Sequence, residues 1–248
     1  MVASKLILVR HGESTANVAA TAAVAAGLET IVMEARDADV SLSPLGELQA
    51  RTLGPRLFAD LDGGLEAARV FSSPYRRSVQ TARFALGDAL PFAIDERLRD
   101  RELGIVDSLT ARGIAARLPA EAERRRWVGK FYYRPPGGEA WTDVALRIRS
   151  FCRDVDWTDP RPVVVFAHDA VVSLFLYVLL HYTEQELKEF LRTRVVTNAS
   201  VTILEHDGTG TWEVGMFSDD RHLREAGMPL SAPGAAASRE PAPATPPR

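Results

Sequence analysis

The chain has 248 residues, of which 46% are hydrophobic, 25% charged and 8% aromatic, and its formal net charge at pH 7 is −3. This is the composition of an ordinary globular protein with enough apolar residues for one well-buried core. A slightly acidic chain has no general attraction for nucleic acid or for an anionic membrane surface, so we expect neither as a partner.

The expected compartment follows from the cysteine content and the apolar runs. Cys152 is the only cysteine, which excludes an intrachain disulfide and a cysteine-built zinc site and suits a reducing cytoplasm. The apolar run before Arg10 is too short for the core of a signal peptide. The longest apolar stretch, residues 171–180, is about half of a membrane span. We therefore expect a cytoplasmic protein.

The predicted elements of the first part of the chain begin with a strand. Residues 5–9 are an apolar run that stops at Arg10, the pattern of a buried strand that ends in a loop. Residues 14–26 are rich in alanine and predict a helix, which Ser14 or Thr15 can cap. Residues 43–57 then predict a capped helix with an apolar face.

The later elements continue the alternation of strands and helices. A second strand and its turn are predicted at 69–74, followed by a helix at 75–86. A third strand at 163–167 precedes an apolar helix at 171–180, and residues 200–217 have the pattern of a hairpin. This order predicts an α/β fold, a three-layer α/β/α sandwich whose mostly parallel sheet is covered by helices on both faces.

Two segments depart from the alternation. Residues 101–140 combine basic, aromatic and Pro-Gly-rich stretches and predict an inserted, partly helical segment, which we call the flap. Residues 228–248 contain few large apolar side chains and predict a disordered tail rich in proline and alanine. Residues 1–227 are therefore expected to form one domain.

Polar residues follow three of the predicted strands. In α/β sheets, ligands bind beyond the carboxyl ends of the strands. Those ends carry Arg10-His11, Ser72-Ser73 with Arg76-Arg77 soon after, and His168-Asp169. A single histidine at a strand end is usually structural. Two histidines with arginines at one edge, however, suit phosphoryl chemistry, because guanidinium groups bind phosphate while a neutral imidazole nitrogen attacks phosphorus.

Four segments of the chain resemble, in order, the signatures of one enzyme family. They are Arg10-His11-Gly12-Glu13-Ser14 with Asn17, Leu42-Ser43-Pro44-Leu45-Gly46 with Gln49-Ala50, the run Ser72 to Ala82, and His168 after an apolar strand. Together they are similar to the histidine phosphatase superfamily, in the branch that includes cofactor-dependent phosphoglycerate mutase. The resemblance extends over about residues 5–217 and implies that family's fold and chemistry.

The resemblance implies roles for five residues. His11 would be the nucleophile and form a transient phosphohistidine. Arg10, Arg77 and His168 would surround the transferring phosphoryl group, with His168 in its protonated form, and Asn17 would add a polar contact. All five positions match the family's motifs in this sequence.

Further candidates for substrate contacts lie beside the nucleophile and in the flap. Ser14 and Thr15 follow the opening motif, and Arg125 lies in a basic run that could contact a second anionic group of the substrate. The other interpretation of that run is a solvated basic helix. Of the adjacent Arg76 and Arg77, the family spacing selects Arg77 and leaves Arg76 at the surface or pocket rim.

The proton donor has three candidates. The segment Leu98 to Gly104 resembles the family segment that supplies the acid, but the position of the family's glutamate is occupied here by Asp100. Glu102 is two residues further along and could share the same side of the chain. Asp169 is the third candidate, because the family's other branch takes its donor from a His-Asp pair at this point.

Three functions are open at this stage. The first is a phosphomonoesterase that hydrolyses a small phosphorylated metabolite, the second a phosphoglycerate mutase, and the third a non-catalytic phosphate-binding module. Arg101-Glu102-Leu103-Gly104 departs from the mutases' Arg-His-Tyr-Gly, which favours the phosphatase. No metal is expected, because arginines supply the positive charge, and no bound cofactor, because no nucleotide-binding loop is present. The oligomeric state is open.

Overall fold

The computed structural model describes residues 5–61, 67–87 and 90–231, and its centre is a six-stranded sheet in the order β3-β2-β4-β1-β5-β6. The strands are β1 (Lys5–Arg10), β2 (Arg69–Ser72), β3 (Ala93–Ile94), β4 (Val163–Ala167), β5 (Val201–His206) and β6 (Trp212–Asp219). β1, β2, β3 and β4 are parallel to their neighbours among themselves, whereas β5 pairs antiparallel with both β1 and β6. The mostly parallel sheet and the late hairpin are therefore confirmed.

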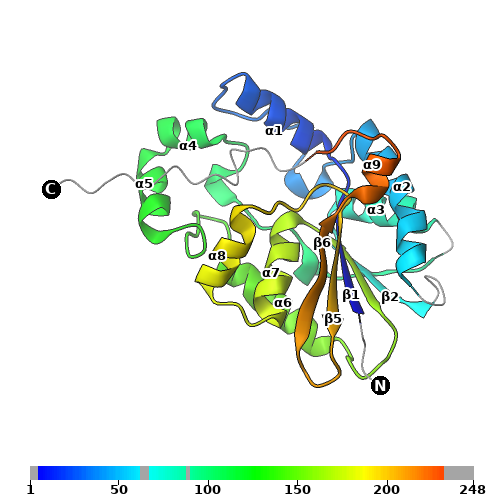
Figure 1. Cartoon of the computed structure of the whole chain (residues 1–248). Coiled ribbons are helices and arrows are strands. Elements are labelled where there is room, and N and C mark those ends of the chain that lie inside the picture. The colour runs from blue at the N-terminus through cyan, green and yellow to red at the C-terminus, as the bar shows by residue number, and fades with distance from the viewer. Residues whose placement is uncertain (1–4, 62–66, 88–89, 232–248) are drawn as a thin grey trace.

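Helices cover both faces of this sheet (Figure 1). The helices are α1 (Thr15–Ala25), α2 (Pro44–Asp60), α3 (Arg76–Leu86), α4 (Ala111–Arg117), α5 (Pro119–Val128), α6 (Trp141–Asp154), α7 (Asp169–Leu179), α8 (Glu184–Arg192) and α9 (Arg221–Glu225). On one face, Leu6 and Leu8 of β1 belong to the core cluster shared with α6 and α7. On the other face, Ile7 and Val9 belong to the cluster shared with α2 and α3. This is the expected three-layer sandwich, and it explains why β1 is apolar throughout.

The structure contains elements that we did not predict. α6 has its buried residues Val144, Ala145, Ile148 and Phe151 along one side, a helical spacing that could have been recognised directly after the flap. β3 has only two residues, both exposed, and therefore carries no apolar signal.

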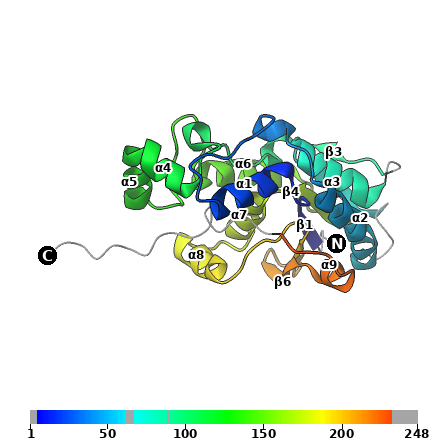
Figure 2. The same cartoon turned by 90° about the horizontal axis from the view of Figure 1, so that it is seen from above.

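The flap lies at one end of the molecule and contains α4 and α5 (Figures 1 and 2). The flap is hydrogen-bonded to residues 26–43, which connect α1 and α2. We call this segment the α1–α2 loop. The Ile31 amide donates to the Ser108 carbonyl (2.8 Å), and the Thr110 amide donates to the Glu29 carbonyl (3.0 Å). Gly113 permits this approach, because a Cβ atom there would lie 1.9 Å from the Glu29 carbonyl oxygen. The flap and the α1–α2 loop are thus directly connected.

The expected tail begins in described residues and continues beyond them. The Gln49 side-chain amide donates to the Pro229 carbonyl (3.2 Å), and the Asn198 amide donates to the Ser231 carbonyl (2.9 Å). The predicted disorder of residues 232–248 lies outside the described residues. In the part of the chain that the structure describes, every helix is too short or too polar to cross a membrane.

Candidate active site

Three parallel strands deliver polar side chains to one edge of the sheet. Arg10 is the last residue of β1 and His11 follows it, while Ser73 follows the end of β2. His168 comes directly after β4 and is the N-cap residue of α7. The rings of His11 and His168 meet edge to face with their centroids 5.1 Å apart. The predicted convergence of the two histidines is thus present.

The loop that carries His11 is bonded on both sides to residues of the recognised motifs. The Gly12 amide donates to the Thr81 hydroxyl (3.0 Å), and the Glu13 amide donates to the side-chain oxygen of Gln49 (2.9 Å). Position 46 accepts only glycine, because a Cβ atom there would lie 1.9 Å from the Glu13 carbonyl oxygen. The motif residues Thr81 and Gln49 therefore fix the backbone of this loop.

His11 is oriented by its own loop. Its Nδ1 lies 2.7 Å from the Gly12 carbonyl oxygen, and a carbonyl can only accept, so Nδ1 carries the proton and Nε2 carries the lone pair. Burial lowers the pKa of His11 well below its usual value, and the nearby charges of Arg77 and Arg10 lower it further. The imidazole is therefore neutral at physiological pH, as a nitrogen nucleophile must be.

His168 is equally buried and is held by Ser73. Its Nε2 lies 2.8 Å from the Ser73 hydroxyl, while its Nδ1 lies 3.3 Å from Oδ2 of Asp100 without forming a hydrogen bond. Burial, followed by the charges of Arg77 and Arg10, lowers its pKa well below the usual value. The free protein thus holds His168 neutral, and the protonated form expected from the sequence requires an anion beside it.

The two arginines are buried but differ in their partners. Arg10 donates from Nη1 to the Val196 carbonyl (2.6 Å), and its Nε is buried without a hydrogen-bond partner in the described structure. Arg77 is 3% exposed, whereas Arg76 is exposed. The family spacing therefore pointed to the buried residue of the two. Arg77 is bound by Asp100 and also by Asp37, a residue of the α1–α2 loop that sequence reasoning missed. No motif or periodicity marks Asp37.

The three candidate acids occupy different positions. Asp100 contacts Arg77 through Oδ2 (3.0 Å), and its Oδ1 accepts from the Arg101 amide (2.8 Å). Glu102 accepts from the Tyr75 hydroxyl (2.7 Å), and it is the Tyr75 ring that packs against His168. Asp169 is the first residue of α7. Of the three, Asp100 alone is placed in contact with both Arg77 and His168 by the described contacts.

Ser14, Thr15 and Asn17 lie at the start of α1. Ser14 is the N-cap residue, and the Asn17 side-chain oxygen accepts from the Ser14 amide (3.0 Å) in a reciprocal capping box. The Asn198 side-chain amide donates both to this Asn17 oxygen (3.3 Å) and to the His11 carbonyl (3.0 Å). Thr15 is exposed and its amide donates to the Ser41 carbonyl. These groups already have partners within the protein, so their role toward substrate stays a prediction.

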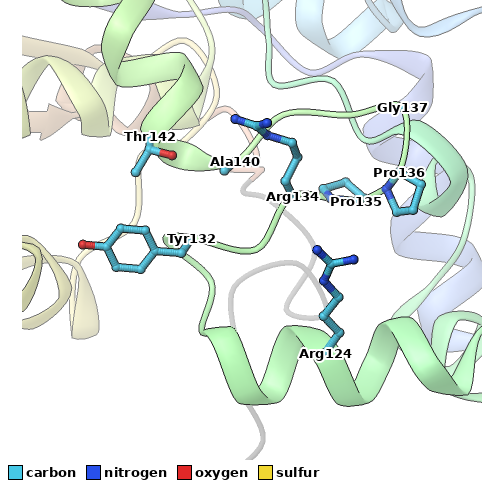
Figure 3. Close-up of a pocket in the computed structure, with 8 residues that line it drawn as sticks. All are labelled: Arg124, Tyr132, Arg134, Pro135, Pro136, Gly137, Ala140 and Thr142. Carbon is cyan, nitrogen blue, oxygen red and sulfur yellow. The ribbon is translucent and has the colours of Figure 1, made fainter.

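A cavity of about 410 Å³ lies between flap residues and the first turn of α6 (Figure 3), and its lining includes neither His11 nor His168. It is lined by Arg124, Tyr132, Arg134, Pro135, Pro136, Gly137, Ala140 and Thr142. Arg125 is half-buried outside that lining, and its charge adds to the burial that lowers the pKa of Arg101. Arg101 follows Asp100 in the chain, so this effect indicates that Arg125 lies near the segment that carries Asp100.

The arrangement supplies what phosphoryl transfer to a histidine needs. A neutral imidazole whose Nε2 carries the lone pair, two buried guanidinium groups and a carboxyl group are close together. Across residues 5–61, 67–87 and 90–231, His, Cys, Asp and Glu side chains form no group that could hold a metal ion.

The chain also matches known proteins over most of its length. Residues 6–220 match the family model of the histidine phosphatase superfamily, branch 1. Glucosyl-3-phosphoglycerate phosphatase of Mycobacterium tuberculosis is 30% identical over 191 residues, covering 73% of this chain and 77% of that protein. Phosphoglycerate mutase-like protein AT74H of Arabidopsis thaliana is 27% identical over 251 residues, covering 92% of this chain and 83% of that protein.

A solved structure supports the same assignment. YhfR of Bacillus stearothermophilus superposes with a TM-score of 0.70 at 28% identity, covering 89% of this chain and all of that one. The family resemblance read from the four motifs is thereby confirmed, and the convergence of His11 and His168 gives it a structural basis. The chain belongs to branch 1 of the histidine phosphatase superfamily.

Proposed function

We propose that the protein is a phosphomonoesterase that hydrolyses a small phosphorylated metabolite through a phosphohistidine on His11. The observation that carries this proposal is the buried pair of neutral imidazoles beside Arg10 and Arg77. His11 Nε2 attacks phosphorus, forming the P–N bond as the ester P–O bond breaks. Asp100 in its acid form gives its proton to the leaving alkoxide, and the resulting carboxylate takes a proton back from the water that hydrolyses the P–N bond, which releases phosphate.

Unsatisfied donors support a phosphoryl group at this place. Arg10 Nε is a donor that is buried without a hydrogen-bond partner in the described structure, and His168 Nδ1, likewise buried and without such a partner, is a donor when the ring is protonated. Buried donors without partners are costly unless a ligand satisfies them. Phosphoryl oxygens accept from both groups, and their negative charge favours the protonated form of His168.

The alternative is a mutase, in which the phosphoryl group returns to another hydroxyl group of the same substrate. Relatives with mutase-like names and the basic residue Arg125 beside the Asp100 segment favour it. The phosphatase is favoured by the similarity to glucosyl-3-phosphoglycerate phosphatase and by Glu102, which stands where mutases of the family have a histidine residue. Glu102 is bonded to Tyr75 and places a further negative charge near the site.

An assay with two substrates distinguishes the candidates. Incubation with p-nitrophenyl phosphate and with 3-phosphoglycerate is expected to release inorganic phosphate from a phosphatase. The 2-phosphoglycerate isomer without net release of phosphate would instead assign the mutase. Absence of both products would contradict either enzyme and leave the non-catalytic phosphate-binding module.

The pH profile of the free enzyme provides a second prediction. Because burial lowers the pKa of His11, kcat/KM for an aryl phosphate should not fall between about pH 8 and pH 6.5. It should fall only in more acidic solution, where His11 becomes protonated and loses its nucleophilic lone pair. Initial rates measured across this range test the expectation. A twofold loss already at about pH 6.5 would show an unshifted histidine and contradict the buried nucleophile.

A further inference from the structure

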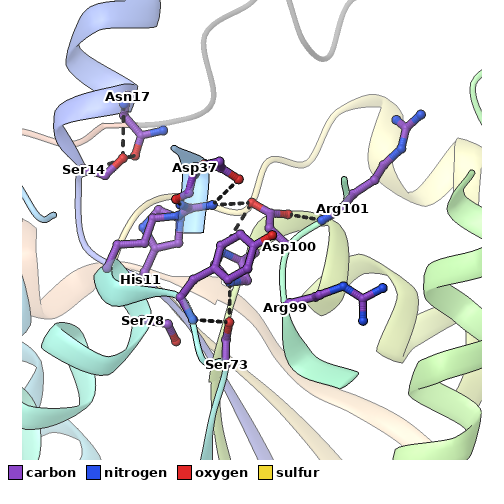
Figure 4. A network of polar contacts seen from close by, with 12 residues as sticks. His11, Ser14, Asn17, Asp37, Ser73, Ser78, Arg99, Asp100 and Arg101 are labelled. Carbon is purple, nitrogen blue, oxygen red and sulfur yellow. Dashed lines mark hydrogen bonds and ion pairs between the residues drawn. The ribbon is translucent and has the colours of Figure 1, made fainter. Parts of the chain in front are cut away.

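The α1–α2 loop inserts one carboxylate into the phosphoryl site. Asp37 begins a 3-10 turn of this loop, which spans Asp37–Asp39. Oδ1 of Asp37 accepts from Arg77 Nη1 (2.9 Å) and Oδ2 accepts from Nη2 (3.3 Å), a two-pronged pairing. The Asp37 carbonyl oxygen accepts from the same Nη1 (2.7 Å). Figure 4 shows Asp37 and Asp100 in one cluster with His11 and Ser73.

These contacts, together with that of Asp100, use both terminal nitrogens of Arg77. Nη1 donates to two oxygens of Asp37, and Nη2 donates to Asp37 and to Oδ2 of Asp100. Each terminal nitrogen has two hydrogens, so all four are engaged. A phosphoryl oxygen can bond to these nitrogens only if an existing partner moves away or shares its hydrogen.

A carboxylate and a phosphoryl group bind guanidinium in the same planar, two-pronged manner. The carboxylate of Asp37 thus contacts Arg77 in the way that a bound phosphoryl group would. It also changes the charge of the site, because its carboxylate offsets the positive charge of Arg77. The site of the free protein is therefore much less attractive to an anion than its two arginines alone would make it.

We propose that Asp37 competes with the substrate's phosphoryl group for the guanidinium of Arg77 and so weakens the binding of anions at the active site. This inference rests on the proposed function, which assigns Arg77 to the phosphoryl group. Asp100 is the partner that stays, because the reaction needs an acid there. Asp37 is the partner that leaves, since nothing in the chemistry requires it.

The position of Asp37 allows it to leave. Its side chain is 34% exposed, whereas that of Arg77 is 4% exposed, so the carboxylate lies at the solvent side of the pair. The loop is held elsewhere by the amides of Ile31 and Thr110, and these contacts do not depend on Asp37. The side chain can therefore turn outward while the loop stays on the flap.

Protonation provides a second way to release Arg77. Burial raises the pKa of Asp37; Arg77 opposes this rise, and the carboxylates of Asp100 and Asp107 add to it. The other charged or titratable groups nearby are the Tyr75 hydroxyl and, in the same turn, Arg36 and Asp39, which pair with each other. As the pH falls, Asp37 is neutralised and its hold on Arg77 weakens, so anions should bind more tightly.

Sulfate is a suitable probe, because it resembles a phosphoryl dianion and does not titrate near neutral pH. Its dissociation constant would be measured by isothermal titration calorimetry on the full chain. Asp37→Asn is expected to bind sulfate about tenfold more tightly than the wild type at pH 7.5, the effect of removing one charged competitor. The matched control is Asp39→Asn, which removes the same charge two residues away and should leave the constant unchanged.

The pH dependence separates Asp37 from the histidines. Between about pH 7.5 and 5.5 the wild type should gain more affinity for sulfate than Asp37→Asn does, because histidine protonation affects both proteins equally. Asp37→Ser provides a second variant without the carboxylate and should reproduce the tighter binding if Asp37→Asn folds poorly. Unchanged or weaker binding in the folded variants, or no sulfate binding in any of the proteins, would overturn the proposal. The measurement needs no turnover, so a missing phosphatase activity would contradict the proposed function and leave the sulfate result intact.

Discussion

Replacing His11 with alanine is expected to lower kcat/KM for an aryl phosphate by about 10⁴-fold or more, the loss typical of removing a covalent nucleophile. The variant keeps Arg10, Arg77 and His168 and should still bind phosphate or sulfate. Its fold should be retained, because the loop is held by the backbone bonds of Gly12 and Glu13. The measurement is steady-state turnover of p-nitrophenyl phosphate.

The covalent intermediate gives an independent readout of the same residue. Denaturation during turnover of a ³²P-labelled substrate should trap label on the wild-type chain and none on His11→Ala. His181→Asn is the control, because His181 is exposed and its positive φ of 54° is a conformation that asparagine accepts. Full turnover by His11→Ala, or label retained on it, would eliminate His11 as the nucleophile.

The positions of the two histidines could be predicted because each depends on a strand. Arg10 and His11 follow an apolar run, and so does His168, and in a parallel sheet such runs end at the same edge. The register pairs Arg10 with Ala167, which places the residues after them side by side. Local sequence was enough here, because residues that follow neighbouring parallel strands lie close together at the same edge of the sheet.

The partners of these residues could not be predicted in the same way. Asp37 reaches Arg77 across 40 positions of sequence, and Asn198 reaches the His11 carbonyl across 187. Both lie outside the regular helices and strands, where no periodicity indicates the direction of a side chain. Their contacts depend on how loops pack against the finished sheet. The flap posed the same difficulty, since two of its hydrogen bonds to the α1–α2 loop join backbone atoms and leave no mark on the residue types.

Replacing Asp100 with asparagine is expected to have an effect that depends on the leaving group. An alkyl phosphate such as glycerol phosphate releases a strongly basic alkoxide, so kcat should fall by about 10²- to 10³-fold without a proton donor. p-Nitrophenyl phosphate releases a stable phenolate, and the loss there should stay below about tenfold. Asparagine keeps the shape of the side chain and can still accept from the Arg101 amide. The comparison requires kcat for both substrates on each variant.

The structure makes this test selective among the three acids. Asp100 lies against both Arg77 and His168, whereas Glu102 is bonded to the Tyr75 hydroxyl. Glu102→Gln and Asp169→Asn are therefore the matched controls. Each should lower kcat by the same factor for the alkyl and the aryl phosphate. A large loss of kcat on the alkyl substrate with little loss on the aryl substrate identifies the donor. If Asp100→Asn lowers kcat equally for both substrates, Asp100 is not the proton donor. The donor is then the control residue whose replacement lowers kcat more for the alkyl than for the aryl phosphate.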